Sequence, residues 1–244
     1  MSDPVPMDTQ PVQAAPANAG SWEDALDIFY APRQVFERRR DGKYWIPLLI
    51  LCAVSVAIYF LSIQFNEAVA DAEFSRAMAE QAAKGGQKMT AEQVAAAKAF
   101  AGKFKALVVY ILPVMLVISA WVSGVIIMLL GNMMGGKLNF AQGVTVGVLA
   151  NFPEVLGRAV VGVQGLFLDT ATVTSKYAFA TSVARFMSAD ANKFLLKLGA
   201  LADPFVIWSS VLVGIGVFVI GRVEKEKAAV LAIIHAIGYA IIAR

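Results

Sequence analysis

The sequence is poor in the residues that most enzymes use for chemistry. It has one cysteine, Cys52, and one histidine, His235, among 244 residues. A lone cysteine cannot form a disulfide within the chain, and inside an apolar segment it is typical of a small buried hydrophobic residue. The sequence has no Cys/His pair for nucleophilic catalysis and no cluster with metal-ligand spacing. We therefore expect no enzyme activity, no metal ion and no cofactor.

Charged residues are also scarce. They make up 16% of the chain, whereas hydrophobic residues make up 58%, and the mean hydropathy is +0.65. Soluble domains average about 45–50% apolar and about 25% charged residues. Long uncharged segments alternate with short charged ones, as is typical of a helical protein that crosses a membrane several times. The net charge of +3 does not indicate a nucleic-acid partner, because the basic residues gather at the ends of apolar segments.

The apolar segments predict an all-α fold, a polytopic membrane helix bundle with five transmembrane helices. The expected spans cover about residues 44–63, 105–133, 140–168, 203–221 and 228–243. Residues 1–20 are rich in proline, alanine and polar residues, and they lack the basic start and apolar centre of a signal peptide. They predict a disordered N-terminal tail.

Two polar segments flank the first expected span. Residues 21–43 combine aromatic residues with a basic end, which predicts an interfacial amphipathic segment; a solvated helix that leads into the first span is the alternative. Residues 64–104 are rich in alanine, glutamate, glutamine and lysine. They predict an outer helical hairpin that turns at Gly85 and Gly86, with a flexible loop as the alternative. Helices that continue straight from the spans would project roughly 30 Å.

The orientation in the membrane follows from the basic residues before the first span. The densest basic cluster of the chain consists of Arg33, Arg38, Arg39, Arg40 and Lys43. Basic clusters next to a span are typically cytoplasmic. We therefore expect a cytoplasmic N-terminus and, after five spans, a C-terminus outside.

Two charged residues, Glu154 and Arg158, lie in the middle of the third apolar segment. A charged side chain at membrane depth costs about 2.5–3.5 kcal/mol, so such residues are candidates for function. On a helix the two would share one face and form an ion pair. Pro153 frees a backbone carbonyl one turn earlier and Asn151 adds a polar group, so these four residues form a candidate intramembrane polar site. Either the pair neutralises itself for a structural purpose, or it forms an ion, proton or head-group site.

Three weaker patterns predict local structure. We expect His235 to be packed and hydrogen-bonded, with a proton relay as the alternative. Asp203 followed by Pro204 predicts the N-terminal cap of a helix. The pattern Gly143-x-x-x-Gly147 predicts a close contact between two helices.

The order and spacing of four motifs resemble the Yip1-domain family of multi-span integral membrane proteins. The matching positions are Phe29, Pro32 and Phe36 before the first span, Trp45 and Pro47 at its start, Gly135, Gly136, Lys137, Phe140 and Pro153 around the third span, and Asp203, Phe205, Trp208 and Gly214 in the fourth. Together these motifs extend over about residues 25–243. The alanine-rich insert at 66–104 is less typical of the family.

The resemblance implies a prokaryotic-type member with five spans and a cytoplasmic N-terminus, which we expect in the bacterial inner membrane. Eukaryotic relatives are linked to membrane traffic and small GTPases, and the sequence itself carries no evidence of that partner. We expect a non-enzymatic protein that organises the membrane or binds lipid or protein partners, among them a second copy of itself. The alternative is a permease or lipid transporter that uses the Glu154–Arg158 pair.

Overall fold

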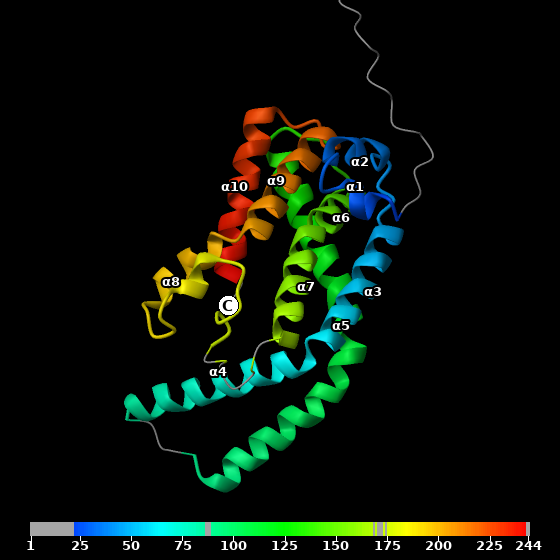
Figure 1. The fold of residues 1–244 in the computed structure, drawn as a ribbon. Coiled ribbons are helices and arrows are strands. Elements are labelled where there is room, and N and C mark those ends of the chain that lie inside the picture. The colour runs from blue at the N-terminus through cyan, green and yellow to red at the C-terminus, as the bar shows by residue number, and fades with distance from the viewer. Residues whose placement is uncertain (1–21, 86–88, 168, 170–172, 174, 243–244) are drawn as a thin grey trace, which may run out of the picture.

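All regular structure in the described part of the chain is helical (Figure 1). The computed structural model describes residues 22–85, 89–167, 169, 173 and 175–242, so the tail expected at residues 1–20 lies outside it. The elements are α1 (Asp24–Asp27), α2 (Pro32–Arg38), α3 (Trp45–Leu61), α4 (Ile63–Ala83), α5 (Ala91–Met133), α6 (Phe140–Ala150), α7 (Phe152–Phe167), the 3-10 helix η2 (Val183–Phe186), α8 (Lys193–Leu201), α9 (Pro204–Val219) and α10 (Lys225–Ile242). Helices α3, α6–α7 and α10 run in one direction, and α5 and α9 run back between them (Figure 1).

Helix α6 packs very closely against α5. A Cβ atom on Gly143 would collide with the backbone oxygen of Gly124 in α5, and one on Gly147 would lie 3.1 Å from the Ser123 hydroxyl. The close helix contact predicted from the two α6 glycines is therefore confirmed. Beside this contact the core consists of fully buried aliphatic side chains of α6 and α9, among them Val144, Val146, Leu149, Leu212 and Val213.

The first apolar helix bends sharply where it leaves the bundle. Helices α3 and α4 meet at 70°, with Ser62 between them. The Ser62 hydroxyl donates to the carbonyl of Ile58 at 2.8 Å, and such back-bonding bends helices. Helix α4 therefore turns away from the bundle axis, instead of continuing α3 in a straight line as the sequence led us to expect (Figure 1).

Helix α4 is held by the first residue of α8 and by the connection that precedes it. Arg76 pairs with Asp190 at 2.6 Å, and Lys193 pairs with Glu80 at 2.9 Å. Phe65, at the start of α4, packs edge-on against Phe179 with ring centroids 5.0 Å apart. The α4 helix and this connection together cover one end of the bundle, which we call the α4 end (Figure 1).

The opposite end, which we call the α1–α2 end, is closed by the two N-terminal helices (Figure 1). The Asp24 carboxylate is 1% exposed and accepts hydrogen bonds from Arg38 at 2.9 Å and Arg39 at 2.5 Å. Pro32 is the first residue of α2, and Phe36 is fully buried against Gly216 of α9. The N-terminal segment is thus packed into the end of the bundle.

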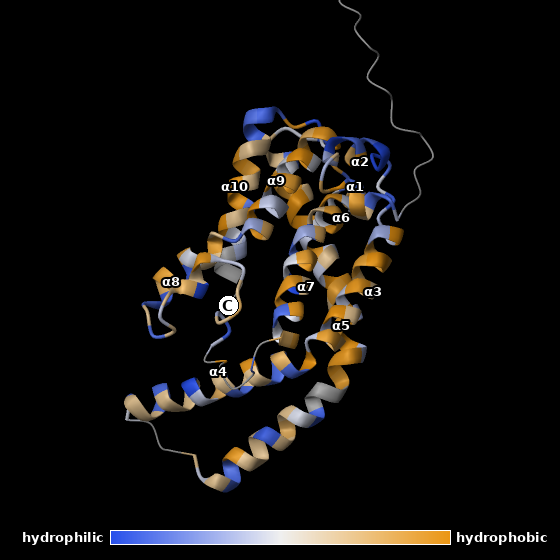
Figure 2. Cartoon of the chain, in the orientation of Figure 1, coloured by the Kyte–Doolittle hydropathy of each residue, from blue (hydrophilic) through white to orange (hydrophobic). Residues whose placement is uncertain are grey.

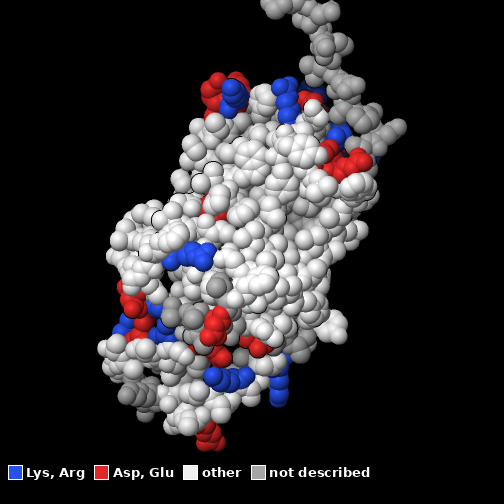
Figure 3. Space-filling model, viewed as in Figure 1, with Lys and Arg blue, Asp and Glu red and all other residues white. Residues whose placement is uncertain are grey.

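The helices between the two ends consist mainly of hydrophobic residues (Figure 2). Charged side chains on the visible face gather mainly at the ends, with a largely uncharged band between them (Figure 3). On α5 the side chains of Leu107, Val114, Ile118 and Val122 are exposed. An exposed apolar belt of this kind fits a helix that faces lipid.

The helices offer two to four candidate membrane spans. Among the described residues, two stretches are long and apolar enough to cross a membrane, Leu107–Met133 and Phe140–Phe167, and the number rises to four if α3–α4 and α8–α9 each count as one bent span. Helix α10 has 18 residues, of which Lys225, Glu226 and Lys227 are charged. The protein is a helical membrane bundle, whereas five spans stay a prediction.

Candidate functional site

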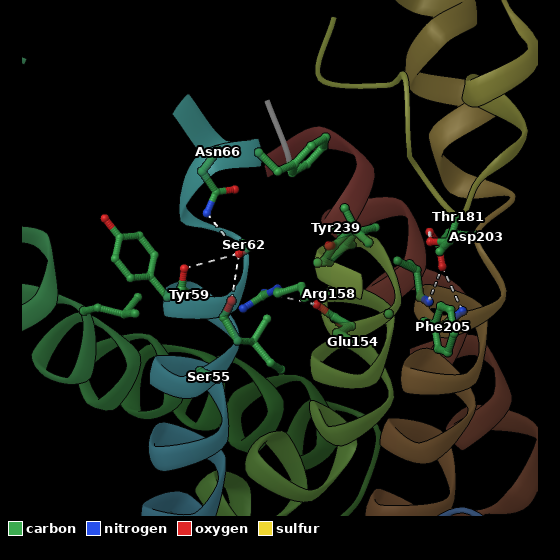
Figure 4. A pocket seen from close by; sticks show the side chains of 17 residues that line it. Ser55, Tyr59, Ser62, Asn66, Glu154, Arg158, Thr181, Asp203, Phe205 and Tyr239 are labelled. Carbon is green, nitrogen blue, oxygen red and sulfur yellow. Dashed lines mark hydrogen bonds and ion pairs between the residues drawn. The ribbon is translucent and has the colours of Figure 1, made fainter. Parts of the chain in front are cut away.

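A cavity of about 290 Å³ lies beside α7, toward the α4 end (Figure 4). Its walls come from α3, α4, α5, α7, α9 and α10 and from the connection before η2. We call it the α7 pocket. Its polar lining consists of Ser55, Tyr59, Ser62, Asn66, Glu154, Arg158, Thr181, Asp203 and Tyr239. The pocket therefore contains both charged residues of the third apolar segment.

Glu154 is held firmly in the wall of the pocket. Its side chain is 10% exposed, and one carboxylate oxygen accepts a hydrogen bond from the Ser209 hydroxyl of α9 at 3.0 Å. The hydroxyl of Tyr239 in α10 interacts with the same carboxylate. Arg158 lies one turn further along α7, with its Nη2 atom 3.8 Å from the second oxygen. Glu154 thus joins three helices.

Arg158 is much less enclosed than its partner. Its side chain is 53% exposed and extends from α7 toward α3 (Figure 4). Within the described residues its ion pair is the loose one with Glu154. A guanidinium group has five N–H donors in a planar fork, so one contact at 3.8 Å leaves most of this donor capacity available. Arg158 is the cationic group that the pocket presents.

Helices α3 and α4 supply a row of small polar groups opposite Arg158. Ser55, Ser62 and Asn66 follow one another at intervals of seven and four residues, which places them on one side of a helical path. Asn66 donates to the Ser62 hydroxyl at 3.1 Å. The hydroxyl oxygen of Ser55 is buried and has no hydrogen-bond partner among the described residues. We did not identify this row from the sequence, and its seven- and four-residue spacing is the signal that could have shown it.

The start of α9 forms the wall beside Glu154. Asp203 caps this helix and accepts hydrogen bonds from the backbone N–H groups of Phe205, at 2.8 Å, and Val206, at 3.4 Å. Its other oxygen accepts from the hydroxyl of Thr181. The predicted N-terminal cap is therefore confirmed. Because its oxygens already accept three hydrogen bonds, Asp203 has little capacity left for a ligand cation.

The remaining lining of the α7 pocket is apolar. Ile58 and Leu112 contribute from α3 and α5, and Val161 contributes from α7. Phe205 packs so closely on α7 that a Cβ atom on Gly157 would lie 2.8 Å from its ring. The pocket therefore combines one accessible cation with hydroxyl and amide groups and an apolar wall.

The structure separates the four residues of the candidate polar site. Glu154 and Arg158 line the pocket, whereas Asn151 and Pro153 do not. Asn151 and Pro153 lie at the junction between α6 and α7, where the Asn151 side-chain oxygen is buried without a partner among the described residues. His235 lies outside the pocket, and its Nδ1 atom is 3.0 Å from the Ser210 hydroxyl, which fits the expected hydrogen-bonded residue.

The other motif residues serve packing and turns. Gly135 has φ +91°, the N–H of Lys137 donates to the carbonyl of Gly221 at 3.0 Å, and Phe140 begins α6. Trp45 packs edge-on against Trp121 of α5. The further motif residues with packing positions are Phe29, Pro47, Gly136, Trp208 and Gly214. Among the motif residues, only Asp203 and Phe205 line the α7 pocket.

Comparison with known proteins assigns the chain to a family. The family model described as the Yip1 domain matches residues 26–243, which is nearly the whole chain. No curated protein and no solved structure matches the chain. The matched range includes Glu154 and Arg158 and confirms the resemblance drawn from the motifs. Together with its apolar helices, the match shows that this chain is an integral membrane protein that belongs to the Yip1 domain family.

Proposed function

We propose that the protein is a non-enzymatic lipid-binding membrane protein whose α7 pocket holds the phosphate-bearing head group of a lipid. The observation that carries the proposal is the half-exposed Arg158 guanidinium, whose ion pair with Glu154 is loose at 3.8 Å. The pocket carboxylates of Glu154 and Asp203 also accept hydrogen bonds from neighbouring hydroxyl groups. A guanidinium group matches the geometry of a phosphate through two parallel hydrogen bonds. Hydroxyl groups such as that of Ser55 supply further donors to phosphate oxygens.

The apolar part of the lining supports a lipid rather than a soluble phosphate compound. Ile58, Leu112 and Val161 lie in the same cavity as Arg158. A ligand with a phosphate at one end and an acyl chain at the other would meet both kinds of wall. The largely uncharged band on the visible face of the bundle would let such a ligand approach from the bilayer (Figure 3).

The packing beyond the pocket favours binding over transport. Toward the α1–α2 end, the side chains of Val144, Leu149, Leu212 and Val213 are all fully buried. A well-packed core of this kind has few voids that could admit a polar substrate. A transporter built on the Glu154–Arg158 pair would have to open this core, so transport is our second candidate.

We further propose five spans formed by α3, α5, α6–α7, α9 and α10, with the α1–α2 end in the cytoplasm of a bacterial cell and the protein in its inner membrane. Support comes from the basic residues at that end, which include Arg33, Arg40, Lys43, Lys137 and Arg222. Basic residues near span ends are typically cytoplasmic. On this arrangement the α7 pocket opens in the outer half of the bilayer.

Purification into lipid discs, followed by mass spectrometry of the bound lipid, tests the proposed function. Arg158→Gln removes the charge and should reduce the retained phospholipid about tenfold or more, since a hydrogen bond to a charged group contributes about 1.5–3 kcal/mol. Arg158→Lys keeps the charge but not the planar fork, so it should retain an intermediate amount. Arg185→Gln is the matched control, because Arg185 is an exposed arginine near the same end that bonds Gln164 outside the pocket.

Glu154→Gln separates the two candidate functions. Glutamine keeps a side-chain oxygen for the Ser209 hydroxyl and removes the negative charge next to Arg158. A phosphate site should then bind lipid as well as before or more tightly, whereas a transporter that depends on this carboxylate should lose transport. Unchanged lipid retention by Arg158→Gln at normal protein abundance would contradict the proposal.

A further inference from the structure

A second cavity, of about 330 Å³, lies at the α1–α2 end, where α2 meets the turn between α9 and α10. Its charged lining consists of Arg33, Glu37, Arg40, Arg222 and Glu224. We call it the basic cleft. Helix α2 and the α9–α10 turn, which line it, lie at the opposite end of the bundle from α4, which contributes to the α7 pocket (Figure 1).

The acidic residues of the basic cleft are already paired. Glu37 forms an ion pair with Arg33 at 3.1 Å, and Glu224 forms one with Lys227 at 2.9 Å. In contrast, Arg40 and Arg222 form no ion pair or side-chain hydrogen bond within the described ranges. Both arginines are exposed. The cleft therefore presents two uncompensated guanidinium groups.

The backbone on both sides of the cleft is fixed by long-range hydrogen bonds. The carbonyl of Arg40 accepts from the side-chain amide of Gln142 in the first turn of α6, at 2.8 Å. The carbonyl of Gly221 accepts from the N–H of Lys137 at 3.0 Å. The two arginines thus extend from anchored positions, which reduces the conformational entropy lost when they bind an anion.

Arg222 occupies a backbone conformation that arginine seldom adopts. Its φ angle is +56°, and it is the one residue other than glycine with positive φ in the described part of the chain. Glycine or asparagine takes this conformation more easily. Non-glycine residues held there cluster at ligand-binding sites, where the surrounding structure compensates the strain.

The floor of the basic cleft is apolar. Phe218 is 40% exposed, and Val219 and Val223 are buried beneath the charged rim. Phe218 and Val219 end the apolar helix α9, and Val223 lies in the turn that follows, so the cleft lies at the end of an apolar helix. We propose that the basic cleft is a second anion site that binds a phosphate group between Arg40 and Arg222. The phosphate belongs either to an anionic lipid or to a soluble phosphate compound.

The test compares protein in lipid discs of phosphatidylcholine alone with protein in discs that contain one-fifth phosphatidylglycerol. Native mass spectrometry measures how much anionic lipid stays bound. Arg40→Gln and Arg222→Asn should each weaken retention about fivefold and the double variant about 30-fold, since one basic residue at a membrane surface contributes about that much. In the second arm, inorganic phosphate is added to protein in phosphatidylcholine discs and the melting temperature is measured. A rise in the melting temperature of the wild type, without retention of anionic lipid in the first arm, would identify a soluble ligand.

Two controls make the result decisive. Lys43→Gln removes a charge at the same end from a lysine that pairs with Asp41 and does not line the cleft, so it should leave retention unchanged. Asparagine tolerates positive φ, so Arg222→Asn should fold and melt at the wild-type temperature or above. The losses should also persist in an Arg158→Gln background, which separates this site from the α7 pocket. Equal losses in Lys43→Gln and Arg222→Asn, or no loss in either arginine variant, would overturn the proposal.

Discussion

At the scale of single residues, the glycines matter for the structure as much as the polar residues do. Gly143 and Gly124 let α6 and α5 approach until a Cβ atom on either would collide with the other helix. Close approach brings many atoms into van der Waals contact, which is the main attraction between helices in a membrane. The two glycines therefore set the position of α6, and α6 continues into the helix that carries Glu154 and Arg158.

Gly143→Ala should destabilise the protein by about 1–3 kcal/mol, because the added methyl group meets backbone that cannot move aside. Thermal unfolding of purified protein measures the change. Gly102→Ala is the matched control: Gly102 also lies in a helix, but a Cβ atom there meets nothing within 4 Å. It should be neutral or stabilising by up to about 1 kcal/mol. Equal effects of the two substitutions would contradict this explanation.

At the scale of elements, the N-terminal helices are held by charge at the α1–α2 end. Arg38 bonds both Asp24 and Asp27, and Arg39 adds a bond to Asp24. A hydrogen bond from Tyr30, followed by one from Arg38, lowers the pKa of Asp27 below its ordinary value of 3.8. A carboxyl with a lowered pKa in the folded state stabilises the fold above its ordinary pKa and loses this contribution as the pH falls.

The free energy of unfolding should therefore fall as the pH drops below about 4, which is the ordinary pKa of aspartate. Asp27→Asn should lower stability at pH 7 and reduce the further loss on acidification. Tyr30→Phe removes the hydrogen bond with the largest effect on Asp27 and should give an intermediate result. Melting temperatures at several pH values check this, and an Asp27→Asn protein with the full acid-dependent loss would refute it.

At the scale of the whole molecule, the two ends differ in what they expose. The α1–α2 end carries the basic cleft, and the α4 end carries α4 and the connection that holds it. The proposed orientation places the first end in the cytoplasm and the second outside. Because Cys52 is the only cysteine and is buried, accessibility labelling of introduced cysteines can test this arrangement.

In a Cys52→Ser background, Lys84→Cys at the end of α4 should react with a membrane-impermeant reagent in intact cells. Lys137→Cys, in the turn before α6, should react only after the membrane is opened. Both lysines are exposed, so a difference in labelling reports the side of the membrane. A reporter fused after Arg244 should give a signal outside the cytoplasm, and a cytoplasmic signal would overturn the five-span arrangement.

The features that were predictable from sequence depend on residues close together in the chain. The cap at Asp203 and the glycine pair of α6 each depend on residues within one turn of a helix. The α7 pocket was only half predictable. Glu154 and Arg158 are one turn apart, whereas Ser209 lies 55 residues from Glu154, and only tertiary packing brings them together.

The bend at Ser62 shows a second limit of sequence reasoning. The apolar sequence before Ser62 and the alanine-rich sequence after it both favour a helix but do not fix the angle between the two helices. The 70° angle depends on one serine hydroxyl that competes for a carbonyl and on the ion pairs that hold α4 at its far end. These interactions are individually weak, so the angle depends on how the whole bundle packs.

The bend also fixes how much of the bilayer α3 can cross. With 17 residues, α3 is about 25 Å long, whereas the apolar part of α5, with 27 residues, is about 40 Å long. The hydrocarbon layer of a typical bilayer is about 30 Å thick, so neither helix matches it. On the proposed five-span arrangement, we expect the bilayer to thin beside α3 and α5 to tilt or to thicken the lipid next to it. The boundary lipids would then have an uneven thickness, which would be a mechanical route to the membrane-organising role expected from the sequence.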